Sequence, residues 1–129
     1  MTNYNISNLL LTNINYNFTK PDKSRINVSV NDAIKIQKIN DKQVDLFVSR
    51  ILNFGENTDT YLNVIYEVSL EFSKEMSKEE TIALLAKKAS GLTPVFSKIS
   101  LLISQITNSS PFGVIVTPPV YDPNEVIVE

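Results

Sequence analysis

The chain has 129 residues, a length typical of one domain, and its 43% apolar and 20% charged residues are usual for a globular protein. It contains no His and no Cys, which excludes classical catalytic triads, thiol nucleophiles, disulfides and structural zinc. The formal net charge of −2 argues against a nucleic-acid partner, because such binding needs a basic surface.

The first half of the chain carries apolar residues at every second position, the pattern of half-buried strands in an antiparallel sheet. Turn signals at Pro21-Asp22, Asn40-Asp41 and Gly55-Glu56-Asn57 separate four such segments. The run Leu9-Leu10-Leu11 breaks the alternation and puts apolar groups on both faces. The stripes are Ile14, Tyr16 and Phe18; Ile26, Val28, Val30, Ile34 and Ile36; Val44, Leu46, Val48 and Leu52; and Leu62, Val64, Tyr66, Val68, Leu70 and Phe72.

The period then changes to that of a helix. Ser77 and Glu80 have the spacing of a capping box, and Gly91 is a natural stop for the helix that follows. Thr93 is expected to cap a second helix with Pro94 at its first position, where a missing N–H costs nothing. The apolar stripe of this second helix is Val95, Ile99, Leu102 and Ile106, widened by Phe96 and Ile103.

The last segment, 112–129, contains Pro118-Pro119 and Pro123 and is expected to be extended. The order of elements predicts one α+β domain over residues 1–129. It consists of a four-stranded antiparallel sheet followed by two helices and an extended Pro-rich tail.

Motifs for chemistry are absent from the sequence. Gly55, Gly91 and Gly113 form neither a phosphate loop nor a dinucleotide fingerprint. Glu67 and Glu71 share a strand face but lie roughly 13 Å apart at strand rise, too far for a glycosidase pair. We therefore expect no enzyme activity, no cofactor and no metal. No basic leader or apolar run of ~18 residues occurs, so we expect a soluble cytoplasmic protein without a membrane partner.

The positive signals are apolar. Phe47 and Ile51 lie on the face opposite the main stripe of their strand, and the second helix is apolar nearly all round. Monomers rarely leave so much apolar surface exposed. These residues favour oligomerisation together with a surface for apolar ligands.

The carboxy-terminal third resembles the SecB family of protein-export chaperones. The similarity rests on a leucine-rich first helix, a Leu-x-Pro entry to the second, and a Pro-rich end. These are Ile82-Ala83-Leu84-Leu85, Leu92-Thr93-Pro94, Pro111-Phe112 and Pro118-Pro119-Val120-Tyr121-Asp122. The four preceding strands match the order of the family.

Several features depart from the family. Val95 to Lys98 replace its usual aromatic and Arg residues, and the polar tail is cut to residues 124–129. Asn13 and Asn17 fall where the family has acidic residues that contact the translocase motor SecA. The chaperone fold is therefore better supported than coupling to export.

The resemblance implies a dimer of dimers that holds unfolded precursor polypeptides in apolar grooves, without ATP, for protein transport and translocation. Candidate groove residues are Phe47, Phe96, Phe112, Val114 and Tyr121, each of which equally suits the core or a subunit interface. Two alternatives remain open. One is a SecB-like adaptor dedicated to a single partner, such as an antitoxin, and the other is a structural oligomer without chaperone activity.

Overall fold

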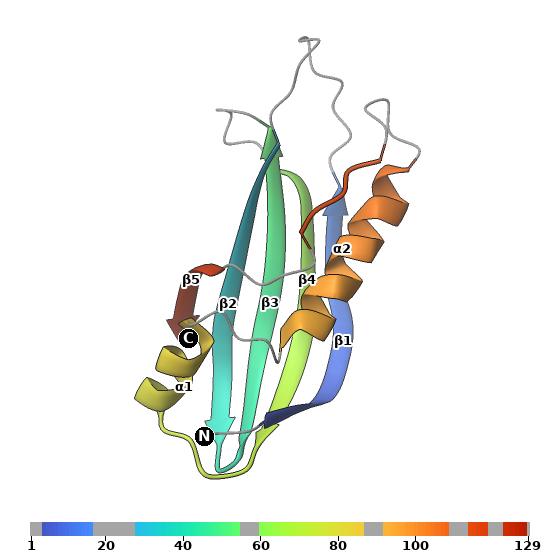
Figure 1. Cartoon of the computed structure of the whole chain (residues 1–129). Helices are drawn as coiled ribbons and strands as arrows, with labels where there is room; N and C mark the ends of the chain where they lie inside the picture. The colour runs from blue at the N-terminus through green and yellow to red at the C-terminus, as the bar shows by residue number, and fades with distance from the viewer. Residues whose placement is uncertain are drawn as a thin grey trace.

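The computed structural model describes residues 4–16, 28–54, 60–86, 92–108, 114–118 and 123–128. Four strands come first and two helices second, as the sequence predicts, and a fifth strand follows the helices (Figure 1). The elements are β1 (Tyr4–Tyr16), β2 (Val28–Asn40), β3 (Gln43–Phe54), β4 (Thr60–Phe72), α1 (Lys78–Ala86), α2 (Thr93–Thr107) and β5 (Pro123–Val128).

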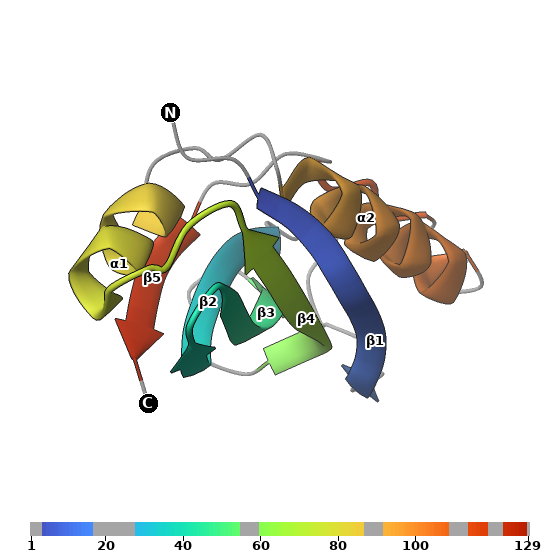
Figure 2. The same ribbon diagram turned by 90° about the horizontal axis from the view of Figure 1, so that it is seen from below.

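The strands form one sheet in the order β1-β4-β3-β2-β5. The first four strands are antiparallel to their neighbours, which confirms the predicted sheet. The extended tail adds β5, which pairs in parallel with β2 and was not predicted. Seen from below, β5 and β1 form the two edges of the sheet (Figure 2).

The period-two stripes give the sheet two different faces. We call the face that carries the stripes the core face and the opposite face the outer face. The hairpin between β2 and β3 turns at Asn40–Gln43, where Asp41 takes a φ of 55°. Fully buried on the core face are Ile34, Ile36, Val44, Leu46, Val48, Leu52, Leu62, Val64, Val68 and Leu70.

Two β-bulges explain why the alternation breaks in β1. The register against β4 shifts at Ser7 and again at Thr12. Each bulge inserts one residue that has no opposite residue in β4, so the side chains after it point to the opposite face from the one that simple alternation predicts. The hydroxyls of Ser7 and Thr12 donate to the carbonyls of Ser69 and Ile65. As a result the core face of β1 keeps an apolar stripe made of Tyr4, Ile6, Leu9, Leu11, Ile14 and Tyr16.

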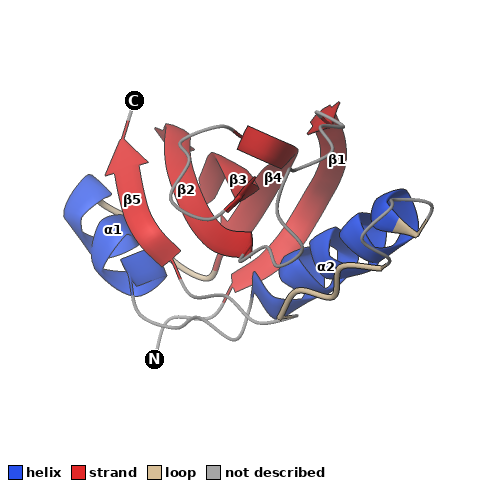
Figure 3. Ribbon diagram, turned by 90° about the horizontal axis from the view of Figure 1, so that it is seen from above, coloured by secondary structure: helices blue, strands red, loops and turns tan. Residues whose placement is uncertain are grey.

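Both helices lie on one side of the sheet and leave the outer face uncovered among the described residues (Figures 2 and 3). Helix α1 lies beside β5, and α2 lies toward β1. Helix α2 buries Val95, Phe96, Ile99 and Ile103, which is the predicted stripe in part. No helix in the described parts of the chain is long and apolar enough to cross a membrane.

The first residues of α1 and α2 can be compared with the two caps predicted from the sequence. The Ser77 hydroxyl accepts a hydrogen bond from the Glu80 N–H at 3.1 Å, which confirms the cap of α1. Hydrogen bonds from Lys74 and then Ser77 lower the pKa of the exposed Glu80 carboxyl. The predicted cap of α2 is wrong by one residue. Thr93 lies inside the helix, and Leu92 stands at the cap position without a side-chain hydrogen bond.

Candidate functional site

A buried ion pair lies within the apolar stripes of the core face. Asp32 of β2 and Arg50 of β3 are direct partners in the sheet register. The Arg50 Nε donates to Asp32 Oδ1 at 2.7 Å, and Nη2 donates to Oδ2 at 2.8 Å. The Arg50 side chain is only 1% exposed and that of Asp32 only 4%. The bidentate geometry satisfies both carboxylate oxygens, as a buried charge requires.

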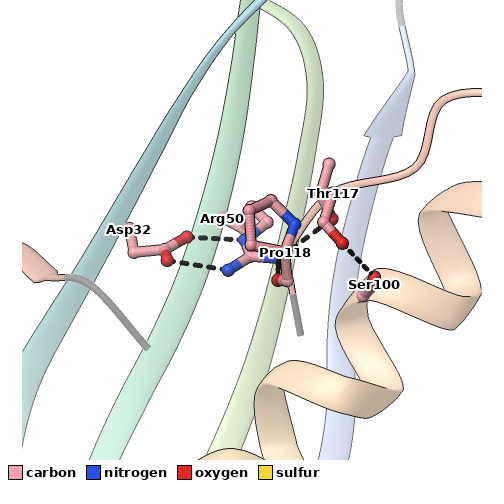
Figure 4. Close-up of polar contacts among 5 residues, drawn as sticks. All are labelled: Asp32, Arg50, Ser100, Thr117 and Pro118. Carbon is pink, nitrogen blue, oxygen red and sulfur yellow. Dashed lines mark hydrogen bonds and ion pairs between the residues drawn. The ribbon is translucent and has the colours of Figure 1, made fainter. Parts of the chain in front are cut away.

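Arg50 also connects the sheet to the second helix and to the chain that follows it (Figure 4). Its Nη1 donates to the hydroxyl of Thr117 at 2.9 Å and to the carbonyl of Pro118. The guanidinium lies 5.2 Å from the centre of the Phe96 ring on α2, within the range of a cation–π contact. One side chain therefore ties β2, β3, α2 and residues 114–118 together.

The sequence carries a signal for this pair, although neither residue was among the expected site residues. The stripe of the second strand skips position 32, and the stripe of the third skips position 50. The two skipped positions carry opposite charges on neighbouring antiparallel strands. A buried charge is rarely tolerated unless it is paired. Opposite charges in two adjacent stripes thus predict a buried partner for each.

Residues 114–118, which we call the return segment, run back along α2 in the antiparallel direction. Three polar side chains of the helix hold it. The Ser100 hydroxyl donates to the Thr117 carbonyl at 2.6 Å. The Ser104 hydroxyl is shared between the Ile115 carbonyl at 3.2 Å and the Ser100 carbonyl of its own helix at 3.1 Å. The Thr107 hydroxyl accepts from the Ile115 N–H at 2.9 Å. The segment therefore fits between α2 and Arg50 with Thr117 buried.

The outer face of the sheet carries apolar side chains without a covering element in the described structure. Phe47 and Ile51 of β3 and Ile65 of β4 are half-buried there. Across the strands, Phe47 lies between Lys35 of β2 and Glu67 of β4. An aromatic ring flanked by opposite charges offers a mixed surface for an apolar partner.

The edge strand β1 exposes further apolar side chains. Leu10 is 54% exposed on the outer face, and Ile14 is 41% exposed on the core face. Among the described strands, only β4 pairs with β1, so its other edge has backbone groups available for pairing. Leu101 of α2 is also exposed. Large exposed apolar groups on an edge strand are typical of contact surfaces.

The predicted groove residues fall into three groups. Phe47 lies half-buried on the outer face, and Val114 is 49% exposed on the return segment. Phe96 is fully buried beneath α2, so in this chain it packs in the core. Phe112 and Tyr121 lie outside the described residues. The structure does not bring Phe47 and Phe96 together, because they occupy opposite faces of the sheet; their binding role stays a prediction.

The two predicted motor-contact positions are also only partly described. Asn13 is exposed on the outer face, where it pairs with Ile65 of β4. Asn17 lies outside the described residues. Glu67 and Glu71 share the outer face with Asn13, so this face carries some negative charge.

No family model and no curated protein sequence matches the chain. Among solved structures, it is similar to Rv1957, a SecB-like chaperone of Mycobacterium tuberculosis in complex with a ChAD peptide from the Rv1956 HigA1 antitoxin. The two chains share 11% sequence identity with a TM-score of 0.64, over 92% of this chain and 88% of that one. The fold is SecB-like.

A protein of unknown function from Streptococcus agalactiae is also similar, at 9% identity and a TM-score of 0.47, over 92% of this chain and 98% of that one. The SecB-like fold confirms the resemblance drawn from the helix entry and the Pro-rich end.

Proposed function

We propose that this SecB-like chain is an ATP-independent holdase that binds unfolded polypeptides through apolar surface, without catalysis. The observation that carries the proposal is the SecB-like fold, shared over most of both chains with a chaperone whose structure contains a bound peptide. The apolar outer face around Phe47, Ile51 and Ile65 and the exposed Leu10 of β1 support it. Apolar burial stabilises such complexes by ~25 cal/mol per Å².

The direct test is suppression of aggregation. A reduced client such as insulin is allowed to aggregate in the presence of near-equimolar chain, with and without ATP. We expect slower light scattering and no effect of nucleotide. Phe47→Ser, on the outer face, is expected to weaken suppression, whereas Ser49→Ala, two residues along the same strand and face, is not. Aggregation that proceeds unchanged with saturating chain would refute the holdase proposal.

A second candidate is an adaptor dedicated to one partner. It is favoured by one specific observation, namely that the similar chaperone was solved with a peptide from an antitoxin. The neutral Asn13 is consistent with a role outside export. Mass spectrometry of co-purifying polypeptides separates the two candidates. Many unrelated unfolded chains indicate a general holdase, and one dominant protein indicates an adaptor.

A further inference from the structure

Most of the hydrogen bonds that hold the return segment involve its main-chain atoms and not its side chains. Five hydrogen bonds between described residues join it to α2 and Arg50. Four of them engage main-chain atoms, namely the N–H and carbonyl of Ile115 and the carbonyls of Thr117 and Pro118. Of these five bonds, only the one from Arg50 to the Thr117 hydroxyl involves a side chain of the return segment.

The spacing of these donors matches an extended backbone. Ser100 and Ser104 are four residues apart on α2, which is roughly 6 Å along the helix. They bond the carbonyls of Thr117 and Ile115, which are two residues apart and span roughly 6.6 Å when extended. The helix therefore presents hydroxyls at the repeat of an extended chain, whatever the sequence of that chain.

The side chains of the return segment alternate as those of a strand do. Ile115 is half-buried and Thr117 is buried, whereas Val114, Val116 and Pro118 are exposed. Val116 is 77% exposed. An occupant thus needs only one apolar or small residue at every second position to fit, and unfolded chains contain many such segments.

We propose that Ser100, Ser104, Thr107 and Arg50 form a binding site for the main chain of an extended polypeptide, which we call the α2 track. The return segment is its resident occupant, and an unfolded client segment replaces it. This inference rests on the proposed holdase function and adds to the apolar outer face a second contact site, which recognises the main chain of the client. Main-chain recognition accounts for binding of unrelated sequences.

The resident occupant sets the affinity of the track. It begins seven residues after α2 ends in the same chain, so it competes with a client as an intramolecular occupant. A client binds only the fraction of molecules in which the track is open, and its apparent affinity falls in proportion to that fraction. A change that weakens the return segment without altering the track should therefore tighten client binding.

Hydrogen exchange of the wild-type chain tests the replacement directly. The probe is reduced and carboxymethylated α-lactalbumin, which is permanently unfolded. We expect saturating probe to speed amide exchange in residues 114–118, because the Ile115 N–H loses Thr107, while α2 keeps its protection. Probe that binds and leaves exchange in 114–118 unchanged or slower overturns this inference alone. Probe that does not bind overturns the holdase function and this inference with it.

Substitutions in the return segment give a second, independent measurement. Ile115→Ala removes the half-buried side chain of the occupant and leaves the track intact. We expect its apparent Kd for the probe to fall by about tenfold, the effect of losing part of one buried apolar side chain. Val116→Ala, the matched control at an exposed neighbour, should bind as the wild type does. Binding by Ile115→Ala that is unchanged or weaker, in a chain shown by circular dichroism to be folded, contradicts the proposal.

Discussion

At the scale of single residues, the pair of Asp32 and Arg50 joins β2 and β3 to α2 and to the return segment. Burying two charges costs several kcal/mol each, and the bidentate hydrogen bonds offset that cost only when both partners are present. The pair is therefore better understood as specifying one arrangement than as adding stability. It fixes where β2 and β3 face each other and where the return segment lies on the sheet.

Removing one partner of this pair should be costly. We expect Arg50→Met to lower the free energy of unfolding by about 3–5 kcal/mol, because it leaves the Asp32 carboxylate buried and unpaired. The double change Asp32→Leu with Arg50→Met should recover part of this loss, though not the contacts to Thr117 and Pro118. Urea unfolding followed by circular dichroism measures both.

The exposed ion pair between Lys74 and Glu80 provides the control. Lys74→Met is expected to leave the urea midpoint unchanged, because exposed pairs contribute little. A single change Arg50→Met that unfolds at the wild-type midpoint would show that the Asp32 carboxylate finds another partner or water.

At the scale of elements, the period of the hydrophobic pattern predicted four strands and two helices because each buries one face. Periodicity did not predict those features of the structure that leave no repeating apolar pattern in the sequence. A bulge such as that at Ser7 inserts a residue without any signature of its own. Strand β5 pairs with the edge of β2, although its own six residues do not alternate clearly. The α2 track was missed because Ser100 and Ser104 contact main-chain atoms far along the chain.

The position of β1 at the edge of the described sheet leads to a prediction about assembly. We expect the chain to form an oligomer, a dimer of dimers, in which exposed apolar groups of β1 and α2 are buried between subunits. Sedimentation equilibrium at micromolar concentration should give a mass well above the 14.5 kDa of one chain. Ile14→Lys should shift the equilibrium toward smaller species, because it places a charge among these groups.

Asn15→Lys is the matched control for this change, since it adds the same charge at the next residue of β1, on the outer face opposite Asn63 of β4. A wild-type chain that remains monomeric throughout the concentration range would contradict the assembly. Loss of assembly by both variants would point to the charge alone.

At the scale of the whole molecule, the charge of the outer face bears on coupling to export. By resemblance, negative charges on this face contact SecA, and here Asn13 is neutral and exposed. Each lost surface ion pair is worth only ~0.2–1 kcal/mol. Two such pairs, lost at Asn13 and Asn17, would together weaken binding by up to about one decade, at roughly 1.4 kcal/mol per decade.

We therefore predict weak or undetectable binding to the cognate SecA by calorimetry. The double change Asn13→Asp with Asn17→Glu should strengthen binding, and added salt should remove the gain. Asn108→Asp, which adds a charge at the end of α2, serves as the control and should have no effect. Submicromolar binding by the wild-type chain would refute the prediction and would direct attention to Glu67 and Glu71 on the same face.

The bulges of β1 have a consequence for changes in chain length. Deleting Thr12 would leave Leu11 and Ile14 two positions apart, so both would stay on the core face and the strand would become regular. Deleting Leu10 instead would force Thr12 to replace Leu11 on that face. The gene should accordingly accept loss of one codon at each bulge, whereas loss of a codon between them should cost apolar packing. The two bulges thus mark the places where the strand can lose a residue during evolution without moving other side chains to the opposite face of the sheet.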